Sequence, residues 1–539
     1  MNLFSLGFKN DKDLQNYLNG GNIKDNKIQN KEDSQNLTIV DESQIENFIE
    51  NNSEKISMGI RNSKGPESYV EENKNKEIEK EEEKYVEREE EIKEKKLRND
   101  SIVLDNKRTL FHKIFGPMEA GSIRGSIFNM VILSLGTGMF ALPKYMSNTS
   151  LFFSCLLITI ICIIVWWSLL LLSKACEKNK IYNYSKLIEV LYGKPFAIIY
   201  DIIVYLYSFG VLILFNVLIN TNLGEGLYGL HYYKKYDTLE DFQKNSFWDD
   251  WYIKILLPYA ISIIIVYPMC LIKDVSKLRI ISLIGVMNVI FLIFIVIYQS
   301  KDYITKDNLE NNVNYTDLKK GFKGKLDVLN FISTIFYASC FHIGCVPVIN
   351  TLKNNVRRRI FKAIRRTILL DIFLYLIIAV IGYLSYPENT PSLIIQRPPI
   401  KKGDSDILMG IGKLGFVFTF ITKLPNTYSS LRITIFDKLF HTSEITNIKN
   451  CIVTLVVIMM CVTSSILYSE ISSYIKIMGG LLSTLVGFLF PALLIVKSSR
   501  KTRHPLKNIL TIAFFTFLTL LGFISSGFTI YDLIKGDEN

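Results

Sequence analysis

The chain contains long runs of apolar residues that have no polar side, and these runs limit what it can fold into. The stretch LFFSCLLITIICIIVWWSLLLL, residues 151–172, would be apolar all the way around a helix. A hydrocarbon core of about 30 Å needs roughly 20 such residues, and this requirement is met repeatedly between Ser122 and Tyr531. Helices of a soluble protein would instead keep one polar face. The sequence therefore predicts an all-α integral membrane protein.

About eleven transmembrane helices follow from the positions of these runs. A single run could be a signal or an anchor, but this number requires a multi-pass protein. The predicted spans cover residues 122–146, 150–173, 197–219, 252–272, 277–298, 326–350, 367–386, 406–431, 450–469, 473–496 and 508–533.

The formal net charge of +11 would suit a nucleic-acid-binding protein, but the placement of the positive residues explains it without nucleic acid. Connections on the side of the N-terminal tail hold 23 Lys and Arg in 73 residues, and those on the opposite side hold 13 in 82. Positive residues gather on the cytosolic side of membrane proteins. We therefore expect a cytosolic N-terminus, a C-terminus outside or in a lumen, and the lipid bilayer as the partner of clusters such as residues 357–366.

Residues 1–118 are polar and predict a charged cytosolic tail. The segment EENKNKEIEKEEEKYVEREEEIKEKK, residues 71–96, has almost nothing to bury, so we expect disorder or at most a lone helix. The predicted organisation is this disordered tail, a transmembrane domain over residues 119–533, and a short C-terminal tail over residues 534–539.

The first span is interrupted in its middle. It reads GSIRGSIFNMVILSLGTGMFALPKYM and carries Gly136, Thr137, Gly138 and then Pro143. Inside a helix glycine costs about 1 kcal/mol and proline about 3 kcal/mol relative to alanine. Backbone groups freed at such a break cannot face lipid, so the break must face a cavity or other helices. A packing face of small residues is the plainer interpretation of one such motif.

The sixth span carries a second interruption, which favours a binding site over simple packing. It reads LDVLNFISTIFYASCFHIGCVPVINTLK, with Ala338, Ser339, His342, Gly344 and Pro347 in its middle. Spans 1 and 6 are equivalent if spans 1–5 and 6–10 form an inverted repeat, and matched broken helices point to a substrate site at the midplane. Freed amides can bind a carboxylate and freed carbonyls an ammonium group, as a zwitterionic amino acid requires.

Several of these motifs resemble those of the amino acid/auxin permease family. The stretch SLGTGMFALP after Asn129 resembles that family's first span, and KDVSKLRIISLIG, residues 273–285, resembles the segment that leads into its fifth. CFH in span 6 and LYLIIAVIGYLSYPENTPSLI in span 7 are also similar to it. The resemblance covers essentially all of residues 120–533, and the Asn- and Lys-rich tail resembles a malaria-parasite member. It implies an inverted-repeat (5+5, APC/LeuT-like) transporter fold plus one extra C-terminal helix, with a scaffold around a mobile bundle.

The candidate site residues lie at the two breaks and, by the resemblance, on spans 3 and 8. The predicted substrate-binding residues are Ser134, Gly136, Thr137, Gly138, Tyr205, Ser208, Ala338, Ser339 and His342. The predicted coupling-ion residues are Asn129, Thr419, Thr422 and Lys423.

Two of these candidates have more than one interpretation. His342 could carry a proton, because imidazole titrates near neutral pH, or could bond a freed carbonyl as a neutral ring. Together with Cys340 and Cys345 it lacks the ligands of a metal site, and no metal is expected. Lys423 departs from the family pattern and could replace a coupling sodium ion or neutralise a helix end.

Three other charged residues of the spans receive structural interpretations. Asp201 and Asp371 fall near the cytosolic ends of the predicted spans, and Lys413 falls near an outer end. Charged groups at these depths can reach water or headgroups, whereas a charge at the bilayer centre is costly.

These features predict a secondary active transporter that moves neutral amino acids, including large or aromatic ones, by alternating access with proton coupling. Sodium coupling, export, and an amino-acid-sensing receptor on a transporter fold remain alternatives. A channel is disfavoured because no pore-loop signature is present, and an enzyme because no nucleophile and base stand at recognisable spacing.

The expected partners are an amino acid substrate and the lipid bilayer, with a proton or sodium gradient and no cofactor. The expected location is the plasma membrane or the membrane of a digestive, lysosome-like vacuole. The sequence leaves the oligomeric state open.

Overall fold

The computed structural model describes residues 122–236, 239–272, 279–306, 308–316, 326–352, 356–399, 406–439, 446–498 and 505–536. The predicted tail, residues 1–118, lies outside them, as do the last three residues of the predicted C-terminal tail.

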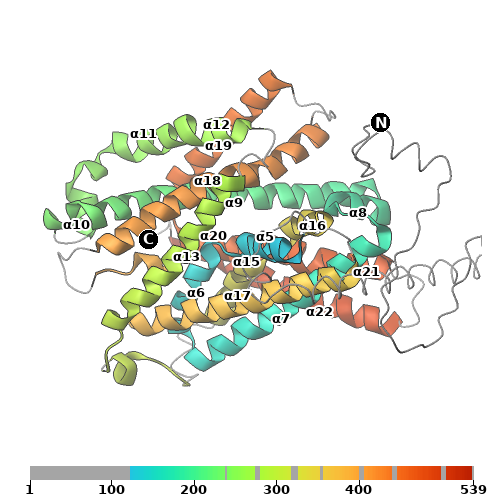
Figure 1. The fold of residues 1–539 in the computed structure, drawn as a ribbon, viewed down its shortest axis with the longest axis horizontal. Helices are drawn as coiled ribbons and strands as arrows, with labels where there is room; N and C mark the ends of the chain where they lie inside the picture. Colours follow the sequence, from blue (N-terminus) through green and yellow to red (C-terminus); the bar gives the residue numbers. More distant parts are fainter. Residues whose placement is uncertain are drawn as a thin grey trace, which may run out of the picture. The chain divides into compact units, whose positions relative to one another are not determined.

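The described part of the chain is helical and contains no strand (Figure 1). Its α-helices are α5 (Ile123–Ser134), α6 (Thr137–Asn148), α7 (Leu151–Asn179), α8 (Tyr184–Tyr192), α9 (Lys194–Leu230), α10 (Leu239–Asn245), α11 (Trp251–Ile261), α12 (Tyr267–Leu271), α13 (Arg279–Tyr303), α15 (Asp327–Ser339), α16 (His342–Asn350), α17 (Arg357–Ser385), α18 (Ile407–Leu439), α19 (Asn447–Leu467), α20 (Ile471–Ile477), α21 (Phe490–Ser498) and α22 (Pro505–Gly536). Short 3-10 turns are η2 (Tyr232–Lys234), η3 (Phe247–Asp249) and η7 (Ile394–Gln396), and π-helical stretches are η4 (Ser262–Val266), η6 (Asn308–Asn312), η8 (Met478–Ser483) and η9 (Leu485–Leu489).

The predicted number of spans is confirmed. Within the described residues, nine helices are long and apolar enough to cross a membrane, and the bent pair α5–α6 makes a tenth. The 25-residue, apolar α13 occupies the place of the predicted fifth span. Spans 4 and 10 each run through π-helical stretches, η4 in the first and η8 and η9 in the second.

Lipid exposure explains why these helices are apolar on all sides. On α7, Ile158 and Cys162 are fully buried, while Phe152 and Leu156 of the same helix are more than half exposed. Apolar side chains that would be unfavourable in water are favourable in hydrocarbon. The exposed apolar surface of α7 is therefore suited to contact with lipid.

The helices pack in two sets. In one set α17 packs against α5, α6 and α7, and α15 packs against α6; in the other, α18 packs against α9 and α13, and α19 packs against α9. The first set contains spans 1, 2, 6 and 7, and the second contains spans 3, 5, 8 and 9. Both breaks therefore belong to the same set of helices.

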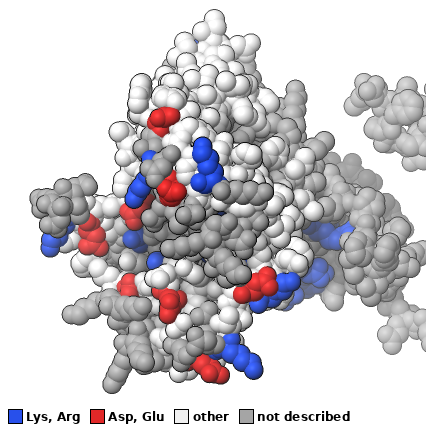
Figure 2. Space-filling view, turned by 90° about the vertical axis from the view of Figure 1, so that its left-hand side faces the viewer, with Lys and Arg blue, Asp and Glu red and all other residues white. Residues whose placement is uncertain are grey.

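A polar network joins α9 and α18 of the second set. The Lys413 ammonium of α18 lies 2.8 Å from the Glu225 carboxylate of α9, and the Gln396 amide donates to that carboxylate at 2.9 Å. The buried Arg397 guanidinium donates to the Ser385 hydroxyl at 2.9 Å. Figure 2 shows an end of the molecule where acidic and basic side chains stand together among uncharged ones.

Candidate functional site

Span 1 breaks where the sequence predicts it. Helix α5 ends at Ser134, α6 begins at Thr137, and their axes differ by 54°. Leu135 and Gly136 between them are extended, with ψ of 94° and −165°. The amides at the start of α6 therefore lack partners in a preceding helical turn.

Span 6 breaks at Cys340 and Phe341. Helix α15 ends at Ser339 and α16 begins at His342. The end of α15 leaves carbonyl groups that no later helical turn bonds, and the start of α16 leaves amides. Backbone groups at this break therefore bond outside the regular helical pattern, as when the Phe341 amide donates to the Ser339 carbonyl at 3.1 Å and the Tyr207 hydroxyl donates to the Cys340 carbonyl at 3.5 Å.

The two breaks are in direct contact. A Cβ atom on Gly138 would lie 2.6 Å from the Ala338 Cα and 2.7 Å from the Ala338 Cβ. Since real side chains do not approach so closely, only glycine allows α6 and α15 to pack at this distance. Glycine is required at position 138 because there is no room for a side chain, and not because of its backbone conformation.

Tyr375 of α17 connects the same two breaks. Its hydroxyl lies 3.0 Å from the Ser134 carbonyl and 2.6 Å from the Ala338 carbonyl, and its side chain is fully buried. These acceptors belong to the last turns of α5 and α15. One hydroxyl proton is therefore shared between carbonyl groups at both helix ends.

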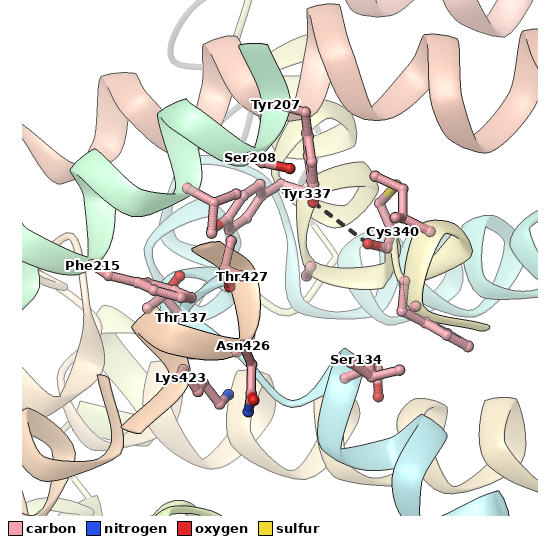
Figure 3. Close-up of a pocket in the computed structure, with 18 of the residues that line it drawn as sticks. Ser134, Thr137, Tyr207, Ser208, Phe215, Tyr337, Cys340, Lys423, Asn426 and Thr427 are labelled. Carbon is pink, nitrogen blue, oxygen red and sulfur yellow. Dashed lines mark hydrogen bonds between the residues drawn. The ribbon is translucent and has the colours of Figure 1, made fainter. Parts of the chain in front are cut away.

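A cavity of about 250 Å³ lies beside the breaks. Figure 3 shows side chains from four spans around it, with Lys423 and Asn426 of α18 on the side of Ser134. Its walls are made by Ile132, Leu133, Ser134, Gly136, Thr137, Gly138, Tyr207, Ser208, Val211, Phe215, Tyr337, Ala338, Cys340, Phe341, Ile343, Gly344, Lys423, Asn426 and Thr427. The walls thus combine polar groups from the breaks and α18 with aromatic side chains from α9, α15 and the second break.

Lys423 binds the end of α5. Its Nζ donates to the Leu135 carbonyl at 2.7 Å. Leu135 is the C-cap of α5, where the partial negative charge of the helix dipole is concentrated. An ammonium group at this point is favoured by that partial charge as well as by the hydrogen bond.

Seven of the predicted site residues meet at the cavity, and six lie elsewhere. Ser134, Gly136, Thr137, Gly138, Ser208, Ala338 and Lys423 line it. Asn129, Tyr205, Ser339, His342, Thr419 and Thr422 are not among the lining residues.

The hydroxyls of span 8 that were predicted to bind an ion hydrogen-bond to backbone. Thr419 donates to the Gly285 carbonyl of α13 at 2.8 Å, and Thr422 donates to the Thr419 carbonyl at 2.8 Å. Both side chains are buried. The Thr419 bond holds α18 to α13, whereas the Thr422 bond lies within α18. The role of both residues in ion coupling stays a prediction.

The other outlying candidates also pack against protein. Ser339 donates to the Ile335 carbonyl at 2.6 Å, and Tyr205 stacks on Phe209. The buried His342 ring has its Nδ1 3.9 Å from the Cys340 sulfur. Asn129 is half-buried on α5, about one and a half turns before the break. Their predicted roles stay predictions.

Asp371 is nearer to the site than its sequence position suggested. It does not lie near a helix end, because α17 starts at Arg357 and places Asp371 at its middle. The carboxylate Oδ1 accepts from the Ser134 hydroxyl at 2.6 Å. The charged residues 357–366 belong to α17 but do not belong to the apolar run from which the span was predicted.

Comparison with known proteins identifies relatives over this whole region. A family model described as "Transmembrane amino acid transporter protein" matches residues 119–535. Amino acid transporter AVT6E of Arabidopsis thaliana is 23% identical over 71% of this chain and 78% of its own. The candidate amino acid transporter AAT1 of Plasmodium berghei is 21% identical over 80% of this chain and 74% of its own.

A solved structure shares the fold. MhsT, crystallised in complex with L-phenylalanine, is 16% identical, with a TM-score of 0.51 over 76% of this chain and 100% of its own. This likeness confirms the predicted LeuT-like fold.

Proposed function

Because the chain belongs to the family of transmembrane amino acid transporter proteins, we propose that it carries neutral amino acids by alternating access from a site between the breaks of spans 1 and 6. The observation that carries this proposal is the contact of Gly138 with Ala338 beside the cavity. Two broken helices at equivalent positions supply backbone groups that ordinary spans keep bonded.

The cavity supports recognition of a zwitterion. The substrate carboxylate would bind the amides at the start of α6, where the helix dipole is positive. The ammonium group would bind near the end of α15, where the dipole is negative. Each charged end of an amino acid thus has a helix end of opposite sign.

The remaining wall favours an apolar side chain of the substrate. Phe215, Tyr337 and Phe341 present aromatic surface to the cavity. Its volume of about 250 Å³ is below the roughly 300–1,000 Å³ usual for drug-sized ligands, which favours a single amino acid over a peptide. Large or aromatic neutral amino acids are therefore the proposed substrates.

Proton coupling is proposed in place of sodium coupling. The Lys423 ammonium already bonds the Leu135 carbonyl, so a cation is present at the end of α5 without a free ion. The two sets of helices suit alternating access, with the set of α5, α6, α7, α15 and α17 moving against the other set. The N-terminus would be cytosolic, in the plasma membrane or the membrane of a lysosome-like vacuole.

Uptake into liposomes tests this function. Purified full-length protein is reconstituted, a pH gradient is imposed, and each radiolabelled proteinogenic amino acid is supplied in turn. We expect uptake of large neutral amino acids and none in protein-free liposomes. No uptake of any amino acid under proton or sodium gradients of either direction would overturn the proposal.

A further inference from the structure

Asp371 is a buried carboxylate at the middle of α17, beside the break of span 1. Its side chain is 1% exposed, and α17 extends about 20 Å to either side of it at 1.5 Å per residue. Oδ1 accepts from the Ser134 hydroxyl, while Oδ2 is buried without a hydrogen-bond partner. Such a group is incompletely satisfied when it is ionised.

No positive group compensates this carboxylate. Within the described residues, no Lys, Arg or His forms an ion pair with Asp371. The groups that face it are Ser134 of α5, the Cys162 thiol of α7 and the Tyr375 hydroxyl of its own helix. Helices α6 and α13 contribute no described titratable group to its surroundings. An unpaired carboxylate that is buried in protein is relieved by binding a proton.

The hydrogen bonds of Ser134 suit both protonation states. Its single hydroxyl proton has two acceptors, the Val131 carbonyl at 2.9 Å and Asp371 Oδ1 at 2.6 Å. When Asp371 is ionised, Ser134 donates to the carboxylate. When Asp371 is protonated, the carboxyl O–H can donate to Ser134, which then donates to Val131. No backbone movement is needed for the exchange.

Ser134 also connects Asp371 to the substrate cavity. Its side chain is part of the cavity wall, and its carbonyl accepts from Tyr375. Tyr375 follows Asp371 by one helical turn and also bonds the Ala338 carbonyl of the second break. A change at Asp371 therefore reaches both broken helices through residues in direct contact.

We propose that Asp371 is the proton-binding residue of the transport cycle and that Ser134 links its protonation to the substrate cavity. This inference rests on the proposed function. One proton from the more acidic compartment binds the carboxylate to give a neutral carboxyl group. The same proton leaves to the other compartment after the helices have moved, which regenerates the carboxylate.

The test separates proton coupling from transport itself. Wild type, Asp371→Asn and the control Asp201→Asn, which removes a different buried acid on α9, are reconstituted at full length. Counterflow of a radiolabelled amino acid without a gradient measures binding and exchange. Accumulation under a gradient of one pH unit measures coupling, and one proton per substrate supports about tenfold accumulation.

We expect Asp371→Asn to retain counterflow but to lose accumulation. The ratio of internal to external substrate should be about ten in wild type and in Asp201→Asn, and about one in Asp371→Asn. Accumulation by Asp371→Asn equal to that of wild type would overturn the inference. Absence of counterflow in wild type would instead contradict the proposed function, so the two failures are distinguishable.

Ser134→Ala keeps the inference testable if Asp371→Asn does not fold. This change removes a donor that stabilises the ionised carboxylate more than the neutral one, since hydrogen bonds to charged acceptors are stronger. The pH of half-maximal uptake is expected to move upward. An unchanged pH profile in Ser134→Ala would count against Asp371.

Discussion

Gly138 packs against Ala338 so closely that no methyl group fits between spans 1 and 6. The contact joins the start of α6 to the end of α15, and both residues line the cavity. Substrate binding and helix packing therefore depend on the same few atoms.

Replacement of Gly138 is expected to abolish transport. Even Gly138→Ala places a Cβ 2.6 Å from backbone, and overpacking of this kind typically costs about 1–3 kcal/mol, or roughly 5- to 150-fold in affinity. Gly138→Leu should be worse. Uptake and substrate-induced thermal stabilisation measure the effect. The control is Gly527→Ala on α22, because a Cβ there meets no atom within 4 Å. Unaltered transport in Gly138→Leu would show that the substrate site is elsewhere.

Tyr375→Phe is expected to weaken substrate binding as well as stability. The change leaves the Ser134 and Ala338 carbonyls without this donor, and a buried unsatisfied group costs about 1–3 kcal/mol. Tyr383→Phe, on the same helix, removes a hydroxyl that accepts from the Asn314 amide away from the breaks. It should lower the melting temperature and leave the KM for uptake unchanged. An equal effect of both variants on KM would contradict a special role of Tyr375.

Lys423 is expected to make uptake independent of sodium. Wild-type uptake should be the same in sodium chloride and in choline chloride at a fixed pH gradient. Lys423→Met keeps the aliphatic stem but loses a hydrogen bond from a charged donor, which is worth about 1.5–3 kcal/mol, so uptake should fall about tenfold or more. Wild-type uptake that requires sodium would contradict the proposed role of Lys423.

The Glu225–Lys413 pair is expected to stabilise the packing of α9 against α18. Both side chains are under 10% exposed, and removal of one partner of a buried pair costs about 3–5 kcal/mol. Lys413→Met should therefore lower the melting temperature in detergent. The double variant Glu225→Gln with Lys413→Met should regain part of the loss, since no unpaired charge remains. A double variant less stable than Lys413→Met would argue against charge pairing as the cause.

The spans and the first break were predictable because their causes are local. Apolar length reveals a span, and Gly136, Thr137 and Gly138 weaken the helix where α5 and α6 separate. The π-helical stretches of spans 4 and 10 have no such sequence signal. The set of residues that line the cavity also depends on how each helix is rotated about its axis. That rotation is determined by packing between helices. Asn426 and Thr427 of α18 thus line the cavity, although the sequence singled out other polar residues of that span.

Helix α17 is longer than the predicted span 7. Hydropathy places the start of that span at residue 367, whereas α17 begins ten residues earlier at Arg357, in a segment rich in arginine. A helix can continue past the hydrocarbon core into a charged segment without any change in backbone. The sequence did not predict the bond between Asp371 and Ser134, because that contact depends on how α17 packs against α5.

The bond from Lys423 to Leu135 also bears on the electrical behaviour of transport. An ammonium group that belongs to the polypeptide returns with the empty carrier in every cycle. Whatever part of the membrane field it crosses in one direction it crosses again in the other, so it contributes no net current. If the substrate is a zwitterion, only a dissociable ion can make transport electrogenic.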